Sequence, residues 1–122
     1  MSAMSDYLEN EILDHILGTG AYTMPSTVYV GLATASFNDD NSGAELTGNN
    51  YARESAAFTA AASGTTSNSA AIEFNAATGS WGLVSHFGIF DAASSGNLLI
   101  HGAFTTAKTI ASGDILKIPT GD

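Results

Sequence analysis

Short runs of alternating apolar and polar residues, separated by loops rich in glycine, serine and asparagine, fill the chain from residue 26 onward. Successive side chains of a strand point to opposite faces, so this alternation is typical of half-buried β-strands. The expected strands are 27–34, 51–61, 70–75, 81–92, 97–106 and 114–120. Strands at this spacing, with no helices between them, predict a mainly β fold, namely an antiparallel β-sandwich or jelly roll over residues 26–122.

One stretch, SDYLENEILDHILGTG, instead has the three-to-four spacing of an amphipathic helix from about Ser5 to Leu17. Ser5 or Asp6 can cap its start, and the glycines after Leu17 end it. Its apolar stripe consists of Leu8, Ile12, Leu13, Ile16 and Leu17. We interpret residues 1–18 as a helical arm, whose stripe anchors the chain to another subunit or lies on its own sandwich. Leu8, Ile12 and Ile16 are therefore interface candidates.

Length and charge exclude several classes of protein. The 122 residues suit a single domain, and no stretch approaches the roughly 20 apolar residues that span a bilayer. Twelve acidic residues against three basic ones give a net charge of −9, so partners such as nucleic acid or an anionic membrane are not expected. The three cations, Arg53, Lys108 and Lys117, are not clustered in the sequence. There is no cysteine and no signal-peptide pattern, which predicts a soluble protein made in the cytoplasm.

Two histidines lie in the expected hairpin, in SHFGIFD and LLIHGAF. A register that pairs Phe87 with Ile100 and Ile89 with Leu98 places these four on one apolar face. His86 and His101 then lie opposite each other on the other face, where two imidazoles can hold a metal or titrate as a pair. A slip of one residue would remove this pairing.

The structural interpretation of His86 and His101 is the stronger one, and both are taken as interface candidates. Zinc requires three or four ligands, and the remaining histidine, His15, lies on the helix. Ser85 is expected on the opposite face from His86, so it cannot act as its nucleophile. Asp91 follows the strand and is expected to bind backbone N–H groups in the turn.

Other chemistry is equally poorly supported. The loop FNDDNSGAE has oxygen donors typical of calcium loops, but Gly43 and the acidic residues do not fit the EF-hand spacing, so a solvated loop is expected. Neither a nucleophile elbow nor a phosphate-binding loop is present. We therefore predict no enzyme activity, no metal and no cofactor. Arg53, the sole arginine, is expected to pair with the acidic loop or with a neighbouring chain.

Several segments together carry a resemblance: SDYLENEILDHILG, TVYVGLATA, NNYARESAAFTAA, TSNSAAIEFNAATGSWGLVSHFGIFDA and GNLLIHGAFTTAKTIASGDILKIPTGD. In this order the chain resembles small virion proteins of tailed bacteriophages, labelled tail fibre or head decoration proteins. The resemblance implies a structural role in the virion, with the protein made in the host cytoplasm.

Three roles follow as hypotheses. The first is a capsid decoration (cement) protein, a homo-oligomer (dimer or trimer) bound to the major capsid protein or other virion proteins. The alternative is a tail fibre, collar or baseplate module that contacts a host surface glycan. A third class, a soluble carbohydrate-binding or enzymatic domain, would need an exposed aromatic surface at Trp81 or Tyr51. Copy number separates the first two, because decoration proteins are as abundant as the major capsid protein.

Overall fold

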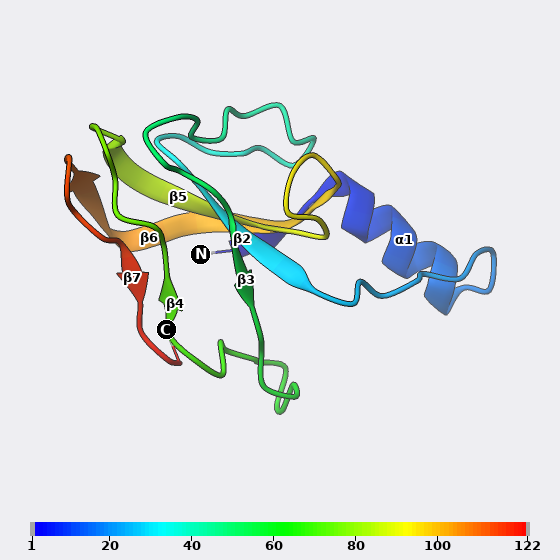
Figure 1. The fold of residues 1–122 in the computed structure, drawn as a ribbon. Coiled ribbons are helices and arrows are strands. Elements are labelled where there is room, and N and C mark those ends of the chain that lie inside the picture. The colour runs from blue at the N-terminus through cyan, green and yellow to red at the C-terminus, as the bar shows by residue number, and fades with distance from the viewer. Residues whose placement is uncertain (1, 122) are drawn as a thin grey trace.

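The computed structural model describes residues 2–121, and it is mainly β with one short helix (Figure 1). The elements in chain order are β1 (Ser2–Met4), α1 (Asp6–Ile16), β2 (Val28–Ala33), β3 (Glu54–Ala56), β4 (Ile72–Glu73), β5 (Gly82–Phe90), β6 (Leu98–Ile110) and β7 (Lys117–Ile118). The predicted helix and the predicted hairpin of β5 and β6 are confirmed. The expected strand over 51–61 is limited to the three residues of β3.

All strand pairs are antiparallel and form two sheets. The larger sheet has the order β1-β6-β5-β2-β3, and β4 pairs with β7 in a two-stranded sheet. In Figure 1, β4 and β7 lie at the end of the molecule opposite α1. The mainly β, antiparallel class is confirmed, but the predicted β-sandwich or jelly roll is not. A jelly roll contains eight strands in two sheets, whereas the described residues form one sheet of five strands and one of two.

The main core lies between the large sheet and the segment that carries β4 and β7. Its buried side chains are Val30, Leu32, Ile72, Phe74, Ala77, Trp81, Val84, Ile110 and Leu116. A second, smaller cluster, formed by Ala33, Phe37, Phe90 and Leu98, includes Phe37 from the loop that follows β2. Both faces of the central strands are therefore covered over part of their length.

The register of the hairpin differs by two residues from the predicted one. Ile89 pairs with Ile100, and Phe87 pairs with Gly102. The backbone N–H of Asp91 donates to the carbonyl of Asn97, which closes the loop one position later than expected. A β-bulge then places Leu99, without a partner of its own, between the partners of Ile89 and Phe90. This bulge shifts the register of the hairpin by one further residue, so that the total difference is two.

A shift of two residues preserves the faces of a strand, whereas a shift of one would exchange them. Phe87, Ile89 and Ile100 therefore share a face, as the sequence predicts. Leu98 lies beyond the bulge and joins the opposite cluster with Phe90.

The N-terminal residues contain a strand that the sequence does not reveal. Ala3 pairs with His101, so β1 forms one edge of the large sheet. The predicted arm over residues 1–18 thus contains a short strand before the helix. The segment SAM has no strand periodicity of its own, and it adopts this conformation because β6 offers it an unpaired edge.

Ser5 joins this strand to α1. Its side chain accepts a hydrogen bond from the backbone N–H of Leu8, as an N-cap does, and donates one to the carbonyl of Leu98. Its backbone N–H donates to the carbonyl of Leu99, 2.8 Å away. Leu8 is buried, so the first turn of the helix is attached to the sheet both by hydrogen bonds and by apolar packing.

We expect Ser5→Ala to lower the free energy of unfolding by about 2 kcal/mol, because it removes an N-cap and leaves a buried carbonyl without its donor. Chemical denaturation of the purified variant measures this loss. Ser112→Ala, at an exposed position, is the matched control and should change stability by less than about 0.5 kcal/mol. Equal losses in the two variants would contradict this role of Ser5.

Candidate functional site

His86 forms a hydrogen bond with its neighbour in β5, Ser85. Its Nδ1 lies 2.7 Å from the hydroxyl of Ser85, and that hydroxyl donates to the carbonyl of Thr34 at 2.9 Å. The expectation that Ser85 points away from His86 is therefore wrong. Four residues of β6 lie between the partners of His86 and Val84, and this irregularity interrupts the alternation of β5.

The Ser85–His86 contact lacks the arrangement of a nucleophile with its base. A hydroxyl has one hydrogen, and here Thr34 accepts it. The imidazole then donates from Nδ1 to the serine oxygen, which is the reverse of the proton transfer that would activate a nucleophile. The pair serves to hold β5 against the end of β2.

His101 attaches β6 to the acidic loop. Its Nε2 lies 2.7 Å from Oδ1 of Asp39, and the backbone carbonyl of Asp39 accepts from the N–H of Asp6 at the start of α1. His101 pairs with Gly88, and His86 pairs with Ala103, so the two histidines are not directly opposite each other. The predicted imidazole pair is absent from this register.

Arg53 organises the other side of the acidic loop. Its Nε and Nη2 donate to both carboxylate oxygens of Glu45 at 2.9 and 2.8 Å, which is a bidentate ion pair. Its Nη1 donates to the carbonyls of Ala92 and Ser95, and its guanidinium lies 3.6 Å from the centre of the Phe90 ring. Of the two pairings that the sequence left open, Arg53 adopts the one within its own chain.

Tyr51 completes this network. Its hydroxyl donates to Glu45 and accepts from the backbone N–H of Leu32, near the end of β2. Burial, with the hydrogen bond to Glu45, raises the pKa of Tyr51 far above its ordinary value. The tyrosine stays neutral at all physiological pH values, so its role is to orient Glu45 rather than to transfer a proton.

The acidic loop uses its oxygen atoms within the chain. Asp40 accepts from the backbone N–H of Ser42, and hydrogen bonds with Ser42 lower the pKa of Asp40. Gly43 is required by close packing, since a Cβ there would lie 2.2 Å from the carbonyl oxygen of Ser36. Within residues 2–121, no group of three or more histidine, aspartate or glutamate side chains is arranged to hold a metal ion.

We expect a chelator to leave the thermal midpoint of the purified protein unchanged. A ligand at one hundred times its dissociation constant stabilises a protein by about 2.7 kcal/mol, so loss of a structural ion would lower the midpoint by several degrees. A scanning-fluorimetry melt with and without EDTA makes the comparison. A decrease that calcium or zinc reverses would contradict the prediction.

Trp81 does not offer the exposed aromatic surface that a lectin-like site would need. It is 5% exposed, packs edge to face on Tyr51 with ring centroids 5.5 Å apart, and donates from Nε1 to the carbonyl of Asn49. Tyr51 is itself half-buried. Both side chains belong to the fold of this region, and neither forms a platform for a sugar ring.

The interface candidates on α1 have different environments. Leu8 is buried against the sheet, Ile12 is half-buried, and Ile16 is 71% exposed. The sequence treats them as one stripe, but only the first part of that stripe packs on the chain's own sheet. Figure 1 shows why, since the helix extends beyond the end of the sheet.

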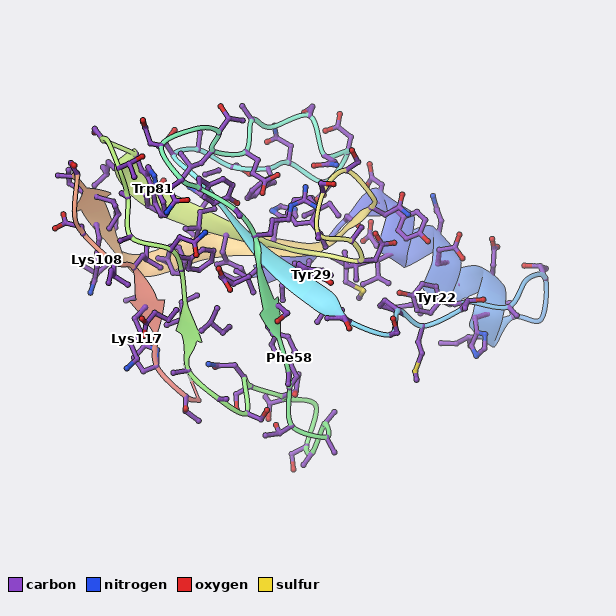
Figure 2. All side chains as sticks on the ribbon, viewed as in Figure 1. Tyr22, Tyr29, Phe58, Trp81, Lys108 and Lys117 are labelled. Atoms are coloured by element: carbon purple, nitrogen blue, oxygen red, sulfur yellow. The ribbon has the colours of Figure 1, made fainter. Side chains whose placement is uncertain are left out.

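An apolar groove of about 570 Å³ opens between the large sheet and the β4–β7 pair. Its lining includes the half-buried aromatic rings of Phe87 and Phe104 and the side chain of Ile118. Lys108 and Lys117 also line it, and Figure 2 shows both at the end of the molecule opposite α1. The fold thus places two of the three cations, which are not clustered in the sequence, along one groove.

Sequence reasoning missed this groove because its walls come from distant segments, which extend from Val30 to Pro119. No spacing along the chain predicts that β7 lies over the β5–β6 hairpin. A usable signal was nevertheless present. After Arg53 is assigned to the acidic loop, the two lysines are the cations that remain.

Residues 3–122 match a family described as the podophage GP4 fiber I protein gp80, or Gp80. The chain belongs to the Gp80 family. No curated protein matches the sequence.

Membership of the Gp80 family makes this protein a structural component of a phage virion, as the resemblance implied. None of the helices within residues 2–121 is long and apolar enough to cross a membrane.

Proposed function

We propose that the protein is a non-catalytic subunit of a podophage fibre. The observation that carries this proposal is the match to the Gp80 fibre family over residues 3–122. The side chains that the sequence suggested for a catalytic, metal or ligand site support a structural role, because each of them binds groups within the chain. These side chains are Ser85, His86, His101 and Arg53. Fibres consist of repeated subunits, so self-association into a dimer or trimer is part of the proposal.

The capsid-decoration role is the second candidate. Its support is the small size and the acidic charge of the chain, which suit a protein that coats a particle exterior. The fibre role is preferred because the matching family is described as a fibre protein. Glycan recognition is not included in the proposal, since Trp81 is buried.

Copy number in purified particles tests the choice between the two roles. We expect this chain in low copy relative to the major capsid protein, measured by quantitative mass spectrometry or by gel densitometry of intact virions. Empty heads that lack tails and fibres provide the control and should contain little of it. A copy number close to that of the major capsid protein, retained in such heads, would contradict the fibre role and favour decoration.

A further inference from the structure

The second half of α1, together with its C-cap residue Leu17, presents apolar side chains that no other described part of the chain covers. Leu13, Ile16 and Leu17 are 56%, 71% and 72% exposed. Glu9, Leu13 and Ile16 follow one another at i, i+4 and i+7, which places them on one helical face. Glu9 is also exposed, so this face is both apolar and negatively charged.

The groove between the large sheet and the β4–β7 pair is also apolar, but it carries positive charge. Phe87, Ile89 and Phe104 line it from the β5–β6 hairpin, and Ile118 lines it from β7. The chain has three cations, and Arg53 is bound to Glu45. The remaining two, Lys108 and Lys117, both line this groove and are exposed.

Within residues 2–121, neither lysine forms an ion pair. Glu73 is the cross-strand partner of Lys117, but no ion pair joins them, and none involves Lys108 in the part of the chain that the structure describes. On a protein of net charge −9, the groove is therefore a site where an apolar, acidic segment meets cations rather than further carboxylates.

We propose that the exposed end of α1 of one copy docks in the groove of a second copy. Leu13 and Ile16 would contact the aromatic floor, while Glu9 would approach the lysines, as amphipathic helices bind in apolar grooves. A helix cannot reach the groove of its own chain, because Figure 1 shows α1 and the β4–β7 pair at opposite ends of the molecule. The contact is thus heterologous, joining copies head to tail into a closed ring or a filament.

Two variants of the full chain separate the halves of this interface. The helix variant is Leu13→Ser/Ile16→Ser, and the groove variant is Lys108→Glu/Lys117→Glu. All four positions are exposed, so both variants should fold as the wild type does, which circular dichroism and the thermal midpoint verify. Leu83→Ser/Ile115→Ser removes two exposed apolar side chains outside the groove and is the control.

Sedimentation velocity over a concentration series measures the assembly. We expect the wild type and the control to associate, and each test variant to associate roughly 100-fold or more weakly. An equimolar mixture of the two test variants should form one-to-one dimers that grow no further. In that mixture the intact helix of the groove variant meets the intact groove of the helix variant, and no second functional contact remains.

A wild type that is monomeric throughout would overturn the proposal, as would test variants that assemble as the wild type does. A mixture of the two variants that stays monomeric would also overturn it. These measurements use the isolated protein, so their outcome is independent of the copy number that tests the fibre role.

Discussion

Arg53→Ala should lower the free energy of unfolding by about 3–5 kcal/mol, because removing one partner of a buried ion pair leaves the other uncompensated. The Arg53 side chain is 7% exposed, and the substitution would leave Glu45 with the Tyr51 hydroxyl as its remaining side-chain donor. The carbonyls of Ala92 and Ser95 would lose the guanidinium as their donor. The substitution would also remove the guanidinium from the face of Phe90. Denaturant unfolding, followed by tryptophan fluorescence, measures the loss.

Arg53→Lys is the matched control for charge. It keeps the cation but cannot reproduce two parallel bonds to Glu45 together with the contacts to both carbonyls. We expect an intermediate loss, smaller than that of the alanine variant. A loss below about 1 kcal/mol for Arg53→Ala, within the range of an exposed ion pair, would contradict the central position of this side chain.

Trp81→Ala should destabilise the protein by about 3–5 kcal/mol, as large-to-small changes at buried aromatic positions do. The indole fills the space beside Tyr51 and donates to the carbonyl of Asn49. Its loss would leave a cavity where the 49–51 segment packs on the main core, and the carbonyl of Asn49 would keep only the backbone N–H of Thr78 as a donor. Circular dichroism during urea titration provides the measurement.

Leu83→Ala is the control, since Leu83 lies two residues away and is 53% exposed. This variant should differ from the wild type by less than about 0.5 kcal/mol. Trp81→Phe should lose less than Trp81→Ala, because it retains most of the apolar volume. If Trp81→Ala and Leu83→Ala had equal effects, Trp81 would not be part of the core.

Features encoded locally could be predicted from the sequence. The period of the apolar residues and the cap at Ser5 predict α1, and the alternation in TVYVGLAT predicts β2. Asp91 binds the backbone N–H and the side-chain amide of Asn97, as expected of an acidic residue in a turn. Each of these depends on neighbours only a few residues away.

Features that depend on tertiary contacts could not be predicted. The hairpin register follows from the loop closure between Asp91 and Asn97 together with a bulge at Leu99, which no residue type marks. The contact between Ser85 and His86 follows from the irregular pairing of β6 with β5. Likewise, β1 exists because the edge of β6 that faces away from β5 is free to pair with the residues before α1. The exposed half of α1 could not be distinguished from the packed half, because both have the same periodicity.

The central claim, that this chain is a fibre subunit, is tested most directly by locating it on the particle. An affinity-purified antibody against the protein, visualised with gold on negatively stained virions, reports its position. We predict label on the fibres and none distributed over the head surface. Label spread evenly over the heads, with unlabelled fibres, would contradict the claim.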